Sequence, residues 1–257
     1  MATFTDNHHE PLVEFHDVSY AVNDGPPIID RLNLRVERGE TFVLLGESGC
    51  GKTTTLRLVN RLLTPTAGEV VVEGKTTTEW DAIRLRRRTG YVIQEAGLFP
   101  HFTVEQNVAL VPNLEDWDEL RVRERVRELL SLVGLDADRF ANRYPRELSG
   151  GQRQRVGVAR ALAADPPLLL MDEPFGALDP LTRSSLQKEF AELKSRLGKT
   201  VIFVTHDVRE ALLLGSRIAL MAKGRIVLLE TPQGFVRSAN ELAEAYLETL
   251  KSDFGVP

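Results

Sequence analysis

Residues 46–53 of this 257-residue chain read GESGCGKT, a spacing of residue types that suits phosphate binding. Its glycines let backbone N–H groups turn inward around phosphate oxygens, and the helix predicted to follow directs its positive dipole end at them. Lys52 would reach the β and γ phosphates of a nucleotide, and the Thr53 hydroxyl would bind Mg²⁺. A glycine turn with a chance lysine is the alternative, but the predicted strand before it and helix after it favour the phosphate site. The predicted nucleotide-binding residues here are Gly46, Glu47, Ser48, Gly49, Cys50, Gly51, Lys52, Thr53 and Thr54.

Two acidic residues with a chemical role follow a short apolar run at residues 168–174, LLLMDEP. A carboxylate at the end of a buried strand has a defined position, which a metal-binding group needs. Asp172 would hold Mg²⁺ through water, and Glu173 would orient or deprotonate an attacking water molecule. A solvated acidic turn also explains this segment alone, but the nearby phosphate loop favours the metal-binding and catalytic interpretation.

The elements that must position these residues alternate between strands and helices. Apolar runs predict strands at 12–22, 32–36, 41–46 and 69–74, and within 166–174 and 199–207. Helical spacing of apolar residues predicts helices at 52–63, 114–135 and 151–165. Short, continuous apolar strands indicate a parallel sheet covered on both faces, and the alternation indicates an α/β fold. The block from about 95 to 160 is interpreted as an inserted helical subdomain.

Composition limits the classes of protein that fit. Hydrophobic residues make up 42% of the chain, enough for a substantial core. The net charge of −5, with both signs interspersed, argues against a nucleic-acid-binding protein. The single cysteine excludes an intrachain disulfide and fits a reducing compartment. We recognise no signal peptide and no uncharged apolar run near the ~18 residues that span a bilayer, so a membrane role would need a partner.

Three further motifs follow the phosphate loop in order: LSGGQ at 148–152, ALD at 177–179 and THD at 205–207. Together with the loop and MDEP, they resemble the ABC-type ATPases from the first strands to past residue 225. The resemblance implies a RecA-like P-loop NTPase core with an antiparallel β subdomain and an inserted helical subdomain. Residues 1–257 would form a single ABC ATPase domain, with core and β subdomain at about 1–94 and 161–229, helical subdomain at about 95–160 and helical tail at about 230–257.

The resemblance also assigns roles to the motifs. The signature loop would bind the ATP held by the opposite subunit through Ser149, Gly150, Gly151 and Gln152. Two nucleotides would then lie between two chains, the second being another copy, which we expect, or a paralogue. Asp179 would lie on the loop that crosses this interface, and His206 would contact the γ-phosphate and the attacking water. Taken alone His206 would be an ordinary histidine, and its place after VIFVT favours the catalytic role.

One position departs from the family's pattern. The family usually stacks an aromatic residue on adenine, and alignment with FHDVSYAVNDG places Val22 at that position. Tyr20 lies two residues earlier, on the same face of an alternating strand. We expect Val22 to contact the base, with Tyr20 as the alternative, and therefore expect weak selection of ATP over GTP.

Residues 91–103, YVIQEAGLFPHFT, carry apolar side chains into a predicted loop after one glutamine. By the resemblance, Gln94 would reach Mg²⁺ and the water near the γ-phosphate. Leu98, Phe99 and Phe102 would contact a short helix of a membrane-spanning permease, which explains apolar residues on a loop. Phosphate occupancy at Gln94 would then move this groove and its partner. The alternative is that the aromatic residues attach the helical subdomain to the core.

The wording GYVIQEAGLFPHFTV with MDEPFGALDPLTR resembles the ATPase subunits of bacterial osmoprotectant importers, which carry glycine betaine, choline and related quaternary amines. Such a subunit would lie at the cytoplasmic face of the membrane, bound to permeases and indirectly to an extracytoplasmic substrate-binding protein. Importers of other solutes and lipid-transport systems stay open as alternatives. A soluble ABC ATPase acting on DNA or ribosomes is disfavoured, since a long coiled-coil insertion and a second ATPase half are lacking.

Three further groups of residues carry expectations of their own. Cys50 lies near inward N–H groups and Lys52, so we expect a thiolate whose alkylation blocks hydrolysis, with an inert small residue as the alternative. The basic run at 84–90 is interpreted as a solvated face or a source of ion pairs between subdomains. The remaining histidines are interpreted as solvated or structural, with metal ligation as an alternative for the first two: His8, His9, His16 and His101.

Overall fold

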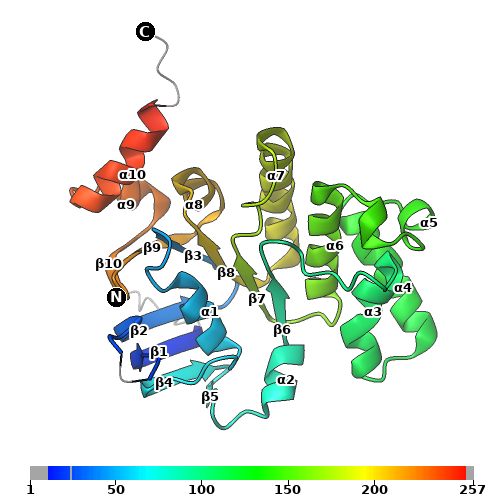
Figure 1. The fold of residues 1–257 in the computed structure, drawn as a ribbon, viewed down its shortest axis with the longest axis horizontal. Coiled ribbons are helices and arrows are strands. Elements are labelled where there is room, and N and C mark those ends of the chain that lie inside the picture. The colour runs from blue at the N-terminus through cyan, green and yellow to red at the C-terminus, as the bar shows by residue number, and fades with distance from the viewer. Residues whose placement is uncertain (1–10, 24, 253–257) are drawn as a thin grey trace, which may run out of the picture.

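The computed structural model describes residues 11–23 and 25–252 and shows two β-sheets with helices around them (Figure 1). The larger sheet has the strand order β10-β9-β3-β8-β7-β6, and the smaller sheet has the order β2-β1-β4-β5. In the larger sheet five neighbouring strands, β9 to β6, run parallel, and β10 pairs antiparallel with β9. The smaller sheet is antiparallel throughout.

The strands follow the predicted apolar runs. The larger sheet consists of β3 (Thr41–Gly46), β6 (Thr89–Val92), β7 (Leu168–Asp172), β8 (Thr200–Thr205), β9 (Arg217–Ala222) and β10 (Arg225–Glu230). The smaller sheet consists of β1 (Pro11–Tyr20), β2 (Ile29–Glu37), β4 (Ala67–Val72) and β5 (Lys75–Thr76). Strands β3 and β8 are buried along their whole length, as expected of parallel strands covered on both faces.

Two hydrophobic clusters lie on opposite faces of the larger sheet. Successive side chains of β3 alternate between them, because strand side chains point to opposite faces. Phe42 and Leu44 join the inner face of the smaller sheet and the apolar side of α1. Val43 and Leu45 join the cluster built mainly by the other helices. The loop after β3 therefore leaves a strand that is held from both sides.

A group of helices between β6 and β7 lies to one side of the sheets (Figure 1). These are α3 (Val104–Leu114), α4 (Glu119–Leu132), α5 (Ala137–Phe140), the 3₁₀ segment η1 (Pro145–Glu147) and α6 (Gly150–Leu162). The remaining helices are α1 (Lys52–Val59), α2 (Ala82–Arg87), α7 (Pro180–Leu197), α8 (Val208–Leu214), α9 (Pro232–Val236) and α10 (Glu241–Ser252). The expected P-loop core with an antiparallel β subdomain and inserted helices is confirmed, and the residue boundaries of its subdomains stay a prediction.

Two predicted helices are shorter than their apolar periodicity suggested. The predicted helix at 114–135 is wrong at its start, because α3 ends at Leu114 and α4 begins at Glu119. The Asp118 side chain accepts hydrogen bonds from two N–H groups of the first turn of α4, and this capping begins a new helix. The helix at 52–63 ends at Val59, and Arg61 follows with a positive φ of 53°.

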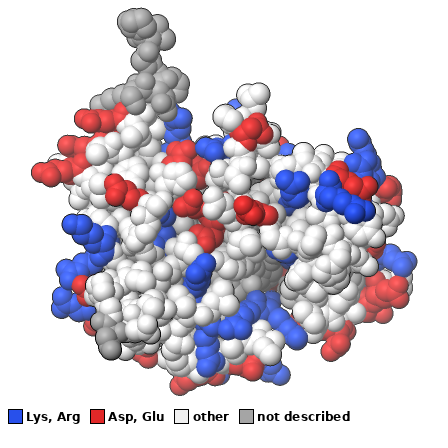
Figure 2. Space-filling view, viewed as in Figure 1, with Lys and Arg blue, Asp and Glu red and all other residues white. Residues whose placement is uncertain are grey.

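The basic run around α2 forms ion pairs, as one of the two interpretations proposed. Arg88 pairs with Glu73 at 2.6 Å, and Arg87 pairs with Glu115 at 3.1 Å, which joins α2 to the end of α3. These four residues and Arg84 line one cleft. Figure 2 shows basic side chains gathered below the centre of this face and both signs of charge interspersed elsewhere on it.

Membrane-spanning helices and metal-binding groups can be assessed only in the described part of the chain. Within residues 11–23 and 25–252, no helix combines the length and apolarity that crossing a bilayer requires. His8 and His9, considered above as metal ligands, lie outside the described residues. In the described part, no group of three or more His, Cys, Asp and Glu residues is arranged to hold a metal ion.

Candidate nucleotide site

The phosphate loop connects β3 to α1 and needs glycine at particular positions. Gly49 and Gly51 have φ values of 82° and 110°, which other residues rarely adopt. A Cβ at Gly46 would lie 2.5 Å from the carbonyl oxygen of Met221, so only glycine fits against β9. These glycines let the loop turn sharply between the strand and the N-terminus of the helix.

Lys52 lies inside this loop with only 5% of its surface exposed. Its ammonium group donates hydrogen bonds to the carbonyl oxygens of Gly46 at 2.7 Å and Glu47 at 2.8 Å. The first turn of α1 holds no acidic residue, so the positive end of the helix dipole adds to the charge of Lys52. A buried cation beside a helix N-terminus suits an anionic ligand such as a phosphate group.

Thr53 and Asp172 come from distant parts of the sequence and meet at the site. The Thr53 hydroxyl donates to Asp172 Oδ1 at 2.8 Å, and the Tyr91 hydroxyl donates to Asp172 Oδ2 at 3.3 Å. Burial raises the pKa of the Asp172 carboxyl, against these two hydrogen bonds, which lower it. Burial and the charge of Asp172 raise the pKa of Tyr91 to about 12. The hydroxyl and carboxylate oxygens are ligand types that fit Mg²⁺.

Glu173 and His206 form the second pair, at the ends of the neighbouring parallel strands β7 and β8. The imidazole Nδ1 lies 3.1 Å from Glu173 Oε2, and Nδ1–H is the group that donates to a carboxylate. Glu173 has a positive φ of 46°, a strained conformation for a residue with a side chain. Its backbone N–H donates to Val204 O in β8, which holds it in this position.

Gln94 follows β6 and lies beside the segment that starts with Glu173. A Cβ at Gly176 would lie 2.9 Å from Gln94 Nε2, so the side chain crosses close to that backbone. Among the described residues, no hydrogen bond joins Gln94 to Thr53 or Asp172. The structure therefore brings Gln94 near the segment that starts with Glu173, and its contact with Mg²⁺ stays a prediction.

The signature residues begin α6, within the helical group set apart from α1 (Figure 1). Ser149 Oγ accepts from the Gln152 N–H at 3.2 Å, and Gln152 Oε1 accepts from the Ser149 N–H at 2.9 Å. This capping box fixes the start of the helix. A Cβ at Gly151 would lie 2.5 Å from Thr182 Cγ2, so glycine lets α6 approach α7. Gly150 is exposed beside them.

Asp179 begins α7 as its N-cap residue and accepts a hydrogen bond from the Thr182 N–H at 3.0 Å. Hydrogen bonding from the Thr182 backbone holds the pKa of the Asp179 carboxyl below its usual value. Leu181, two residues later, is 85% exposed. The start of α7 therefore presents a carboxylate and an apolar side chain to solvent.

The two candidates for adenine contact differ in exposure. Val22 is 54% exposed, whereas Tyr20 is half-buried against the core below the smaller sheet. The segment after Val22 reaches the phosphate loop, because a Cβ at Gly51 would lie 2.6 Å from Ile29 Cδ1. Val22 thus stands on an exposed turn, and its contact with the base stays a prediction.

The expected Cys50 thiolate is wrong. Cys50 is 7% exposed, and burial raises the pKa of its thiol. The charge of Lys52 and nearby N–H groups lower that pKa by less. The position in a phosphate loop suggested an anion, but the thiol packs into the core between β3 and the smaller sheet. The inert-residue alternative fits this environment.

The apolar loop after Gln94 is held by one buried polar residue, Asn107. Leu98 is half-buried against the core, whereas Phe99 is 42% exposed. The ring centroids of Phe99 and Phe102 are 5.3 Å apart. Asn107 is fully buried, accepts from the Phe99 N–H at 2.8 Å and donates to the carbonyl oxygens of Phe99 and Phe102.

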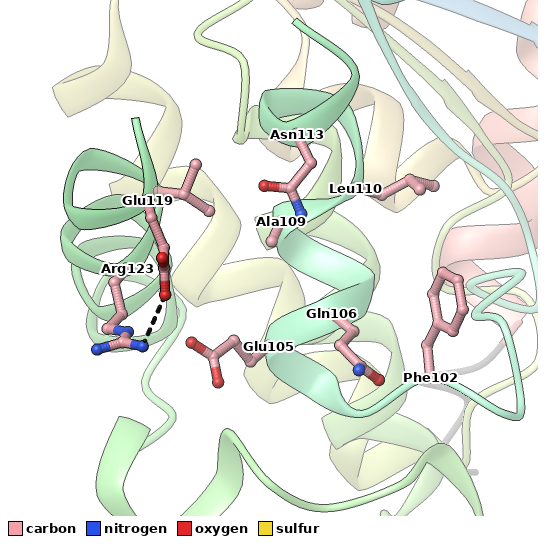
Figure 3. Close-up of a pocket in the computed structure, with 9 residues that line it drawn as sticks. Phe102, Glu105, Gln106, Ala109, Leu110, Asn113, Glu119 and Arg123 are labelled. Carbon is pink, nitrogen blue, oxygen red and sulfur yellow. Dashed lines mark hydrogen bonds and ion pairs between the residues drawn. The ribbon is translucent and has the colours of Figure 1, made fainter. Parts of the chain in front are cut away.

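A groove of about 400 Å³ continues from this loop between α3 and α4 (Figure 3). Phe102 lines one end of it, on the loop before α3, and Glu119 and Arg123 line it from α4. Arg160 of α6 donates to the carbonyl oxygens of Ala96 and Gly97. The loop that follows Gln94 is thus tied both to the groove and to the signature helix.

The sequence analysis missed Asn107 and Tyr91. A polar residue within the apolar pattern VEQNVAL was the available signal for Asn107. Tyr91 gave no such signal, because its contact with Asp172 depends on the pairing of β6 with β7.

A buried lysine in a glycine loop, with carboxylates at the end of a nearby parallel strand, defines a nucleotide-binding protein of the P-loop class. A family profile described as ABC transporter matches residues 29–176, more than half of the chain. The chain therefore belongs to the ABC transporter family.

Three curated relatives are bacterial transport proteins. The osmoprotectant import ATP-binding protein OsmV of Salmonella typhimurium is 51% identical, over 87% of this chain and 59% of that protein. The choline transport ATP-binding protein OpuBA of Bacillus subtilis is 49% identical, over 92% of this chain and 62% of that protein. The glycine betaine uptake system ATP-binding protein YehX of Escherichia coli is 46% identical, over 95% of this chain and 79% of that protein. The chain thus spans 59% and 62% of the first two relatives.

Two solved structures share the fold. The dimeric, post-hydrolysis ATP-binding cassette MJ0796 with bound ADP and Pi is 35% identical, with a TM-score of 0.75 over 86% of this chain and 98% of that chain. The cbiO1 protein of Clostridium perfringens, part of a cbiONQ transporter complex, is 28% identical. Its TM-score is 0.81 over 92% of this chain and 95% of that chain.

Proposed function

We propose that this chain binds and hydrolyses ATP as the energy-supplying subunit of a bacterial importer for osmoprotectants such as glycine betaine or choline. The observation that carries the proposal is the meeting of two pairs at the ends of parallel strands. Thr53 and Asp172 form one pair, and Glu173 and His206 form the other. In open α/β sheets, ligands bind beyond the carboxyl ends of the strands, where these pairs lie.

The residues of the site divide the work of hydrolysis. Lys52 and the loop N–H groups bind the β and γ phosphates. Thr53 and Asp172, with Gln94, would hold Mg²⁺, which neutralises phosphate charge when bound. Glu173 orients the attacking water and accepts its proton. His206 holds the Glu173 carboxylate and contacts the γ-phosphate.

A second chain would complete the site. Ser149 and the N–H groups that begin α6 belong to the helical group away from α1, so they would serve the nucleotide of the other subunit. The exposed Asp179 and Leu181 would lie on the same interface. The dimeric cassette MJ0796, which holds ADP and Pi, supports such an assembly by analogy. We expect two copies of this chain.

The transport role rests on the relatives and on the apolar loop. The relatives are ATP-binding proteins of osmoprotectant, choline and glycine betaine transport. Exposed Phe99, with Leu98 and Phe102 beside it, would receive a short helix of a permease. The chain would then lie on the cytoplasmic face of the membrane, held there by permease subunits and reached by an extracytoplasmic binding protein only through them.

Uptake by a reconstituted complex tests this proposal. The chain, its permease and its binding protein would be placed in vesicles with enclosed Mg²⁺ and ATP, and entry of labelled glycine betaine and choline measured. We expect uptake that requires ATP and that Lys52→Ala abolishes. ATP-dependent uptake of another solute alone would contradict the substrate class, and parent-rate hydrolysis by Lys52→Ala would contradict the assigned nucleotide site.

A further inference from the structure

Glu210 is a buried carboxylate for which none of the motifs accounts. It lies on α8, is 4% exposed and accepts two hydrogen bonds. The Thr205 hydroxyl donates to its Oε2 at 2.5 Å, and Gln187 Nε2 donates to its Oε1 at 2.9 Å. Burying a carboxylate is unfavourable unless hydrogen bonds compensate, and here both oxygens are bonded. Burial raises the pKa of this carboxyl, and the two hydrogen bonds lower it.

Thr205 connects Glu210 to the turn that carries His206. Thr205 is 2% exposed at the end of β8, and its hydroxyl also accepts from the Asp207 N–H at 2.9 Å. This hydrogen bond joins Thr205, directly before His206, to Asp207, directly after it. Since its proton goes to Glu210, the carboxylate sets the direction in which Thr205 accepts from Asp207.

On the other side, Glu210 connects to α7, the helix that follows the Asp179 loop. Gln187 lies one turn after Arg183 on this helix. Arg183 Nη2 donates to the carbonyl oxygens of Gly176 at 3.3 Å and Leu178 at 3.1 Å. The charge of Arg183 acts on the Glu210 carboxyl, and its Nε is buried without a hydrogen-bond partner in the described part of the chain.

We propose that Glu210 is a positioning residue for ATP hydrolysis. Through Thr205 it holds the turn that carries His206, and through Gln187 it fastens that turn to α7. Arg183 fastens the Asp179 loop to the same helix. The two loops thus keep one mutual arrangement while the nucleotide is cleaved. This inference rests on the proposed function, because it takes His206 as the residue beside Glu173 in the reaction.

The first test removes the Glu210 carboxylate and then exchanges it with the amide of Gln187. Glu210→Ala should lower kcat roughly tenfold, because small displacements of reacting groups slow catalysis steeply, and leave KM for ATP within about twofold. Gln187→Glu should also lower kcat, because it sets two carboxylates against each other. Combining it with Glu210→Gln restores a carboxylate–amide pair and should return kcat to within about threefold of the parent.

The opposite ends of β8 supply a matched control. Thr205 and Thr200 are both buried, and each hydroxyl accepts from a backbone N–H, that of Gly39 in the case of Thr200. Thr205→Val and Thr200→Val should lower the melting temperature by similar amounts. Thr205→Val should also lower kcat about tenfold, whereas Thr200→Val should keep the parent kcat. Equal effects on kcat would overturn the inference, because loss of stability alone would then explain them.

Failure of this inference and failure of the proposed function give different results. Hydrolysis by His206→Ala at the parent rate would remove the catalytic assignment on which both depend. If His206→Ala is inactive but Glu210→Ala keeps the parent kcat, only the positioning role is contradicted. A swapped pair that refolds to the parent melting temperature without recovering kcat would also overturn it.

Discussion

At the scale of single residues, the site works through pairs that the chain brings together from far apart. Thr53 and Asp172 are separated by 119 positions and Glu173 and His206 by 33, yet each pair lies within hydrogen-bond distance. The strand order β3-β8-β7 explains this, since the three strands end at the same edge of the sheet. Under the proposed function, the first pair would hold Mg²⁺ and the second would prepare the attacking water.

Replacing the proposed base tests this assignment directly. Glu173→Gln keeps the shape of the side chain but cannot take a proton, so kcat should fall about 100-fold or more. ATP binding should persist, because Lys52 and its loop are unchanged, and ATP should hold the dimer closed. Hydrolysis rates and size-exclusion chromatography with ATP measure both effects. Glu79→Gln, at an exposed glutamate, is the control, and a Glu173→Gln variant with the parent rate would exclude Glu173 as the base.

Cys50 gives a prediction of opposite sign to the one made from its sequence position. A free thiol has a pKa of about 8.5, and burial raises that of Cys50, so less thiolate exists at pH 7 in the folded than in the unfolded chain. Alkylation by iodoacetamide at pH 7 should be at least about tenfold slower in the folded protein than in urea. Mass spectrometry measures both rates, and an equal or faster rate in the folded protein would restore the thiolate expectation.

At the scale of elements, the local sequence predicted contiguous motifs better than contacts between elements that are distant in the chain. The phosphate loop is a contiguous motif whose glycines and lysine act within eight positions, so its pattern sufficed. The contacts of Glu210 and Tyr91 join strands and helices that meet only in the folded chain. No spacing of residues in the sequence predicts these contacts. The break between α3 and α4 was hidden because apolar periodicity continues across it, while the cap at Asp118 depends on one side chain.

The loop after β6 and helix α3 offer a test at this scale. Asn107→Ala would remove the partly buried hydrogen bonds that its side chain makes to backbone groups of Phe99, Phe102 and Thr103. The free energy of unfolding should fall by about 2–3 kcal/mol. Urea unfolding measures it, with Asn113→Ala on the exposed side of the same helix expected within about 0.5 kcal/mol of the parent. An Asn107→Ala variant as stable as that control would show that the loop does not depend on this side chain.

At the scale of the whole molecule, short chains of contacts connect the candidate nucleotide site to the apolar loop that carries Phe99. Gln94 lies against the Glu173 segment, and three residues later the chain reaches the carbonyl group that Arg160 of α6 holds. The signature helix, the apolar loop and the end of β6 thus share direct contacts. Under the proposed function, a change at the γ-phosphate would reach Phe99 and the groove through these contacts.

Phe99→Asp separates the proposed coupling role from a role in the core. Phe99 is 42% exposed, so a charge there should leave the isolated subunit folded and able to bind ATP. In the reconstituted complex it would face the apolar side of the permease helix, and uptake should fall to the level seen without ATP. Val227→Asp is the matched control, because Val227 is 44% exposed on β10, at the edge of the larger sheet opposite β6 (Figure 1). Uptake, ATP binding and melting temperature would be measured for both variants. If Phe99→Asp unfolds the isolated subunit while Val227→Asp does not, Phe99 belongs to the core, and the permease must dock elsewhere.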